Sequence, residues 1–216
     1  MNIRKLIAAK LLTTLTAVLA TTSADAATIT DLYNTGVDNS HVTLGNGATD
    51  SHYYVVSDSQ PGVVVNSPGY PFPAWVANVN GPGGSRWVST QRDAYGRLGS
   101  FKYQTTFTIP SYADLNSVVI NGLWATDDGN SNILINGNPT NQSTLGHSSL
   151  TPFTITGASN FFHGSGNTIE FVFDNVTGPT GLRVDGISGT FVPEPTGFAA
   201  GLAGLAGIGA VRRRGR

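Results

Sequence analysis

The chain has 216 residues, with 12 Lys and Arg against 13 Asp and Glu, and it contains no cysteine. The missing thiols exclude disulfides, thiol catalysis and thiolate metal sites, so stability must come from packing or from a bound cation. Residues 27–191 carry five basic and eleven acidic side chains, a net charge of −6. This charge argues against nucleic acid or anionic lipid as a partner, because both bind proteins mainly through Lys and Arg contacts to phosphate.

The first 26 residues have the three parts of a secretory signal peptide. Their basic region consists of Arg4, Lys5 and Lys10. An apolar segment follows at residues 11–20, and Ala24-Asp25-Ala26 fits the small-x-small cleavage rule, which predicts that the mature chain starts at Ala27. A membrane-spanning N-terminal helix is the alternative, disfavoured because ten apolar residues are too few to span a bilayer.

Residues 27–191 have the length of one domain and read as all-β, with no ten-residue stretch of helical periodicity. Short segments rich in β-branched and aromatic residues recur, separated by clusters of Gly, Asn, Asp and Pro. They lie at residues 51–56, 62–65, 86–90, 101–109, 117–125, 132–136, 168–174 and 181–192. This spacing predicts a β-sandwich or jelly roll.

Three local signals refine this expectation. Asn136-Gly137 and Asp174-Asn175 are turn signals of the kind that reverse a strand. Residues 69–84 contain too many Pro and Gly for a central strand, so we expect a long surface loop, where binding tends to occur in a sandwich. Glu170 falls in an alternating strand and is expected to face outward.

Five segments of the chain carry a more specific pattern of strand alternation and turn residues. They are residues 101–110, 118–128, 133–137, 167–175 and 181–191. Their order and spacing resemble the galactose-binding-like jelly roll, a superfamily that includes sugar-binding domains appended to glycoside hydrolases. The resemblance implies a carbohydrate-binding sandwich over residues 101–191. Before residue 99 the strands are predicted from physical patterns alone.

One polar run beside a tryptophan is the main candidate for glycan binding. It contains Trp124, Asp127, Asp128, Asn130 and Asn132. An indole face can stack on the C–H face of a sugar while carboxylate and amide groups bind its hydroxyls. The alternative is a core tryptophan followed by a hydrogen-bonded turn. Asp127 and Asp128 are also candidate oxygen ligands for a structural calcium ion, although their spacing is not that of an EF-hand.

A second aromatic group flanks the Pro/Gly loop. It consists of Tyr70, Trp75, Trp87 and Tyr95. Trp87 in particular is a candidate for stacking on a sugar. These rings either form a sugar platform or hold the loop against the sandwich.

Signals for catalysis are weak, and we predict no catalytic residue. The four histidines, His41, His52, His147 and His163, show no paired metal-ligand spacing. Two function classes therefore compete. The first is a noncatalytic exported protein that associates with exopolysaccharide or another glycan, and the alternative is an exported glycoside hydrolase or lyase on the same scaffold.

The end of the chain has three parts in a fixed order. They are Pro193-Glu194-Pro195, an uncharged apolar segment at 197–211, and a basic cluster that includes Arg212, Arg213 and Arg214. As a helix the apolar segment would span about 22 Å, less than the roughly 30 Å of a bilayer core. The positive-inside rule keeps the arginines cytoplasmic, which places the preceding domain on the far side of the membrane.

This ending resembles the PEP-CTERM sorting signal of Gram-negative bacteria; an ordinary tail anchor is the alternative. The resemblance implies an exosortase as partner, transient insertion in the inner membrane, and cleavage near the Pro-Glu-Pro. It predicts three regions: a signal peptide (1–26), a β-sandwich (27–191) and a sorting signal (192–216). The mature protein would then be at the cell surface or extracellular.

Overall fold

The computed structural model describes residues 25–157 and 161–194. The predicted signal peptide up to Ala24, and the sorting signal from Pro195 onward, lie outside the described residues. Within the described part of the chain, no helix is long and apolar enough to cross a membrane.

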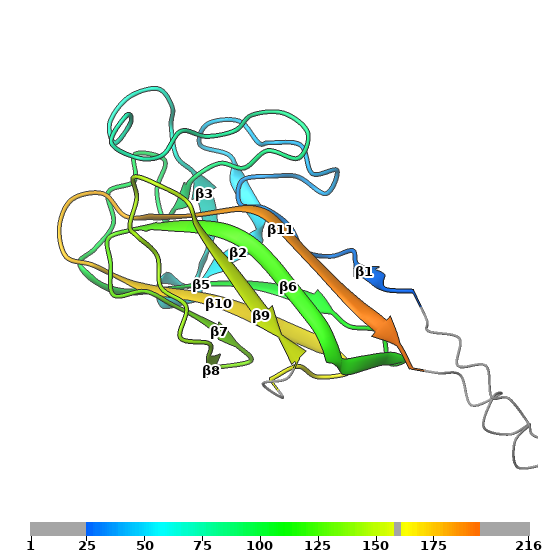
Figure 1. The fold of residues 1–216 in the computed structure, drawn as a ribbon. Helices are drawn as coiled ribbons and strands as arrows, with labels where there is room; N and C mark the ends of the chain where they lie inside the picture. The colour runs from blue at the N-terminus through cyan, green and yellow to red at the C-terminus, as the bar shows by residue number, and fades with distance from the viewer. Residues whose placement is uncertain (1–24, 158–160, 195–216) are drawn as a thin grey trace, which may run out of the picture.

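The described residues form an all-β structure, which confirms the predicted class (Figure 1). The strands are β1 (Ala27–Ile29), β2 (Thr49–Val55), β3 (Gln60–Val64), β4 (Val88–Ser89), β5 (Gly99–Thr108), β6 (Ala113–Asp127), β7 (Asn132–Ile135), β8 (Asn138–Pro139), β9 (Thr151–Thr156), β10 (Gly166–Asn175) and β11 (Gly181–Pro193). A single turn of 3-10 helix, η1 (Val56–Asp58), follows β2.

The strands pair antiparallel in one sheet, in the order β8-β7-β10-β5-β2-β3-β4-β11-β6-β9, with β1 added on β11. The sheet folds over so that its two halves face each other. Phe171 of β10 lies 5.5 Å from Trp124 of β6 and 6.2 Å from Phe153 of β9, measured between ring centroids. The result is a two-layer sandwich, with β8 and β9 at the two ends of the sheet (Figure 1).

Alternation along the strands builds the core between the layers. In β5, Phe101, Tyr103 and Phe107 point inward and are buried, while the residues on the opposite face, such as Lys102 and Thr106, are more exposed. In β10, Phe171 and Phe173 do the same from the neighbouring strand. Burying each such ring contributes roughly 1.5–3 kcal/mol. The main stabilisation of this cysteine-free domain therefore lies in the aromatic layer.

All eight predicted strands are present, but β1, β8 and β9 were not predicted. The Asn136-Gly137 turn is confirmed: both residues have positive φ, at 49° and 80°, and Ile135 pairs with Asn138 across them. The prediction of a turn at Asp174-Asn175 is wrong. Both residues belong to β10 and pair with β5, and the chain reverses only after Asn175.

The long pair β6–β11 runs from one end of the sandwich to the other. Gly181 pairs with Asp127 at one end, and Pro193 pairs with Ala113 at the other. β1 joins the second end, where Ala27 pairs with Phe191. Since β11 has 13 residues, a rise of about 3.3 Å per residue separates the two ends by roughly 40 Å. β1 and the end of β11 therefore lie together at the end of the sandwich far from Asp127; Figure 1 shows these two strands side by side.

Candidate functional site

The candidate site lies where β6 ends at Asp127 and the Pro/Gly-rich loop folds over it. The loop carries Trp75, whose Nε1 donates a 2.6 Å hydrogen bond to Asp127 Oδ2. His147 Nδ1 lies 3.2 Å from Asp127 Oδ1. The backbone oxygen of Asp127 accepts a 2.9 Å bond from Thr180 Oγ1. The Asp127 carboxyl group is therefore buried and contacted by Trp75 and His147, while Thr180 holds the backbone of the same residue.

Burial, together with the adjacent Asp128 carboxyl group, raises the pKa of Asp127 to about 6, although Trp75 and His147 act in the opposite direction. Asp128 is half-buried, and its Oδ2 accepts the backbone N–H groups of Val176 at 2.8 Å and Thr177 at 3.2 Å. No Lys or Arg of the described residues forms an ion pair with either carboxylate.

A cavity of about 230 Å³, here called the acidic hollow, opens beside this pair. It is lined by Tyr70, Pro71, Ala74, Trp75, Asp127, Asp128, His147, Thr177, Gly178 and Pro179. At its margin the rings of Tyr70 and Tyr95 lie 6.1 Å apart, and the two residues are 63% and 53% exposed. Tyr95 reaches this margin through a backbone bridge to Pro179. The acidic hollow thus combines exposed aromatic surface with hydrogen-bonding groups.

A second cavity, here called the neutral hollow, shares Trp75 with the acidic hollow and measures about 470 Å³. Its lining is Ser67, Phe72, Pro73, Trp75, Val76, Ala77, Asn78, Asn80 and Ser148, with no charged side chain. Asn78 Nδ2 is buried without a hydrogen-bond partner among the described residues. Aromatic surface with amide and hydroxyl groups is suited to an uncharged polar ligand.

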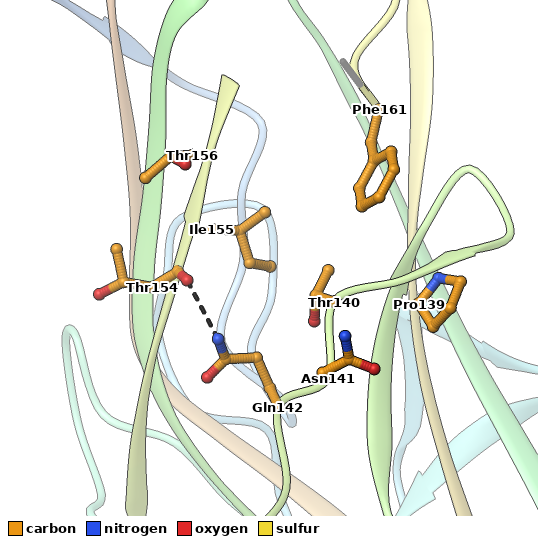
Figure 2. Close-up of a pocket in the computed structure, with 8 residues that line it drawn as sticks. All are labelled: Pro139, Thr140, Asn141, Gln142, Thr154, Ile155, Thr156 and Phe161. Carbon is orange, nitrogen blue, oxygen red and sulfur yellow. Dashed lines mark hydrogen bonds between the residues drawn. The ribbon is translucent and has the colours of Figure 1, made fainter. Parts of the chain in front are cut away.

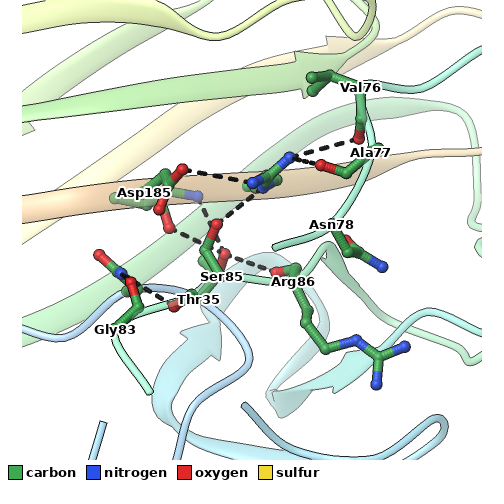
Figure 3. Close-up of polar contacts among 12 residues, drawn as sticks. Thr35, Val76, Ala77, Asn78, Gly83, Ser85, Arg86 and Asp185 are labelled. Carbon is green, nitrogen blue, oxygen red and sulfur yellow. Dashed lines mark hydrogen bonds and ion pairs between the residues drawn. The ribbon is translucent and has the colours of Figure 1, made fainter. Parts of the chain in front are cut away.

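Arg183 of β11 fixes the loop segment at Val76 and Ala77, which lines the neutral hollow. Figure 3 shows the polar contacts around Ser85 and Ala77. The Arg183 guanidinium is buried, donates a 2.8 Å bond from Nε to Ser85 Oγ, and bonds the backbone oxygen of Ala77. Trp87 Nε1 donates to the backbone oxygen of Val76 at 2.8 Å. These contacts satisfy the polar groups of a segment without regular structure, so the loop is fixed before any ligand arrives.

The structure corrects the proposal that Trp124 and Trp87 stack on sugar. Both residues are 0% exposed. Trp124 packs in the main core against Phe171, and Trp87 lies in a smaller core beneath the loop, 4.2 Å from Trp75. Neither indole face is accessible to a ligand. Their hydrophobic area instead fixes β6 and the loop.

The other predicted site residues are only partly brought together. Asp127 and Asp128 line the acidic hollow, but Asn130 donates to Asp174 Oδ2 at 2.5 Å instead. Asn132 begins β7, and its Oδ1 accepts the N–H of the next residue at 2.8 Å. Tyr70 and Tyr95, which belong to the aromatic group predicted beside the Pro/Gly loop, form the exposed pair at the margin of the acidic hollow.

Calcium at Asp127 and Asp128 stays a prediction. Three of the four carboxylate oxygens already contact a nitrogen atom. The nitrogens are Trp75 Nε1, His147 Nδ1 and the backbone nitrogens that follow Asn175, at Val176 and Thr177. A cation would have to compete with these groups. Across residues 25–157 and 161–194, no group of three or more His, Cys, Asp or Glu side chains is placed to hold a metal.

The histidines do not form a cluster among the described residues. His41 and His52 stack on Tyr33, with ring centroids 4.7 and 3.6 Å from it. Of the described histidines, only His147 contacts Asp127. No spacing of residues in the sequence predicts this contact. Glu170, expected to face outward, is mostly buried and pairs with Lys102 at 3.1 Å.

No protein-family model matches the chain, and no curated protein matches it. Among solved structures it is similar to CBM35 from Paenibacillus barcinonensis, with 12% identity, a TM-score of 0.36, and coverage of 63% of this chain and 92% of that one. It is also similar to a cyclase from Fischerella sp. TAU, with 12% identity, a TM-score of 0.38, and coverage of 80% and 100%. A β-D-glucuronidase from Dictyoglomus thermophilum gives 16% identity and a TM-score of 0.38, over 79% of this chain and 28% of that one. Similarities this weak leave the function to be argued from the site itself.

Proposed function

We propose that the protein is a noncatalytic, exported glycan-binding protein whose hollows beside Trp75 hold a saccharide. The observation that carries the proposal is the exposed Tyr70–Tyr95 pair at the margin of a preformed polar cavity. Exposed aromatic rings grouped beside a cavity are typical of an interaction site. A sugar fits such a site, since its C–H face packs on an aromatic ring while its hydroxyls need donors and acceptors.

The polar groups around the rings match this ligand. The acidic hollow offers the carboxylates of Asp127 and Asp128 as acceptors and the hydroxyl of Thr177. The neutral hollow adds the amides of Asn78 and Asn80. Because Trp75 belongs to both cavities, a saccharide longer than one unit can contact both. Binding without large rearrangement limits the entropy cost.

An exported carbohydrate-active enzyme is the second candidate, favoured by the pKa of about 6 that burial gives Asp127. A carboxyl group with this pKa is suited to donate a proton near neutral pH. Glycosidases, however, place two carboxyl groups about 5–10 Å apart on opposite sides of the scissile bond. Asp127 and Asp128 instead adjoin each other on one side of the acidic hollow. Binding without cleavage therefore fits the arrangement better.

Export and sorting are the remaining part of the proposal. We infer that an exosortase recognises the Pro-Glu-Pro motif while the inner membrane holds the segment that follows it. The motif begins directly where β11 ends at Pro193, at the end of the sandwich opposite the hollows. A domain held at this end would direct Tyr70 and Tyr95 away from the membrane, toward the extracellular glycan.

The test compares retention of the full chain on the exopolysaccharide of the producing cells with release of reducing or unsaturated sugar. Tyr70→Ala combined with Tyr95→Ala should remove retention and leave the melting temperature unchanged, because both rings are exposed. Tyr112→Ala is the matched control, since that ring is 57% exposed near the opposite end of the domain. Retention that survives the double substitution contradicts the proposed site, and sugar release by the wild type would favour the enzyme.

A further inference from the structure

A third cavity, here called the seam groove, lies between the two edges of the folded sheet (Figure 2). Its volume is about 290 Å³, close to the lower limit of roughly 300 Å³ for small-molecule pockets. It is lined by Pro139, Thr140, Asn141, Gln142, Thr154, Ile155, Thr156 and Phe161. β8 and the residues after it form one wall, and β9 forms the other. A cavity of this size fits one small ring.

The lining of the seam groove has no charged side chain. Ile155 and Phe161 supply apolar surface, and Figure 2 shows the side chains of Ile155 and Asn141 directed into the space between the walls. The amides of Asn141 and Gln142 border it on one wall, whereas the Thr154 side chain points away from it and its hydroxyl donates to Asn121 Oδ1 at 2.8 Å. Apolar surface bordered by neutral donors and acceptors matches a sugar ring, with its C–H face and its hydroxyls.

A partner strand is a less suitable occupant, because both sheet edges are blocked. Each edge strand carries a proline, Pro139 in β8 and Pro152 in β9, which removes a backbone donor. The backbone oxygen of Thr154 already accepts a 3.3 Å bond from Gln142 Nε2 across the groove. An added strand would therefore find few free backbone partners, whereas a ligand bound through side chains would not depend on them.

We propose that the seam groove is a second saccharide site, which takes one neutral sugar ring. The inference rests on the proposed glycan-binding function but uses different residues. Thr154 pairs with Asn121 of β6, six residues before Asp127, which separates the groove from the acidic hollow by about 20 Å along the strand. One molecule can then hold two chain segments, so the protein cross-links a glycan as well as binding it.

The test uses the full chain and three neutral hexasaccharides, of mannose, glucose and galactose, measured by titration calorimetry and saturation-transfer NMR. Asn141→Gly combined with Gln142→Ala removes both amides. Glycine is chosen because Asn141 has φ of 60°, a conformation that alanine would strain. Ser143→Ala is the control, because Ser143 lies next to these residues but does not line the groove.

The wild type should bind at least one hexasaccharide at two sites per chain, and the groove variant should weaken one of them about tenfold. The Tyr70→Ala, Tyr95→Ala variant should weaken only the other. A single site lost only in the tyrosine variant would overturn the groove and leave the loop site standing. A single site lost only in the groove variant would overturn the site at Tyr70 and Tyr95 and leave the seam groove standing. No binding by any of the three sugars would overturn both proposed sites. A melting temperature equal to that of Ser143→Ala confirms that the groove variant is folded.

Discussion

The indole of Trp75 and the carboxyl group of Asp127, 52 residues apart, share a buried hydrogen bond of 2.6 Å. This bond joins the Pro/Gly-rich loop to the last residue of β6. It also satisfies a carboxyl group that burial would otherwise leave costly. The two hollows that share Trp75 therefore depend on one contact between the loop and the sheet.

Trp75→Phe should keep the aromatic surface and remove the donor. Because the Trp75 hydrogen bond lowers the pKa of Asp127, its loss should raise that pKa above about 6. The unsatisfied carboxyl group should also cost about 1–3 kcal/mol of unfolding free energy. Carboxyl ¹³C chemical shifts of Asp127 during a pH titration measure the first effect, and denaturant unfolding the second. An unchanged pKa would show that the indole donor does not stabilise the ionised carboxylate.

The stability of the domain should respond to pH through Asp127. Burial raises its folded pKa to about 6 from 3.8, so the folded state binds the proton more tightly than the unfolded state. The resulting stabilisation is fully present below pH 3.8 and is lost as pH rises through 6. Relative to Asp127→Asn, which does not titrate, the wild type should therefore gain stability as pH falls from 7 to 5. The difference in unfolding free energy between the two proteins at each pH is the measurement, and a constant difference would contradict the shifted pKa.

Trp124 should behave as a core residue. Replacing it by alanine removes a fully buried ring and should cost about 3–5 kcal/mol of unfolding free energy. Leu145→Ala is the control, since that side chain is 78% exposed and should change stability by less than about 0.5 kcal/mol. Chemical denaturation compares the three proteins. Loss of glycan retention by Trp124→Ala without loss of stability would contradict the core role and show that the indole contacts the glycan.

Local patterns were sufficient for most of the fold and for part of the site. The alternation that predicts β6 places Trp124 on the same face as Val118 and Ile120, so its burial could have been inferred from the sequence. β9 was not predicted because it contains Pro152, which weakens a strand signal. The meeting of Tyr70 with Tyr95, and of His147 with Asp127, depends on long loops crossing at one end of the sandwich. No local periodicity reports such contacts.

The last prediction concerns the end of the domain. Pro193 pairs with Ala113, Val192 N donates to Ser117 Oγ at 2.7 Å, and Glu194 N donates to the backbone oxygen of Tyr112 at 2.6 Å. A protease that needs an extended substrate would have to break these bonds to cut before Glu194, whereas a later cut leaves β11 complete.

We therefore expect the mature extracellular protein to end at Glu194 or later and to lack Arg216. A chain ending after Glu194 should keep the wild-type melting temperature, and one ending after Thr190 should melt lower, because it loses the pairing of β11 with the start of β6. Mass spectrometry of the secreted protein and thermal unfolding of both truncations are the measurements. Intact Arg216 on the wild-type extracellular protein would refute sorting by cleavage, and a mature end before Pro193 would refute the protection of this strand by its pairing.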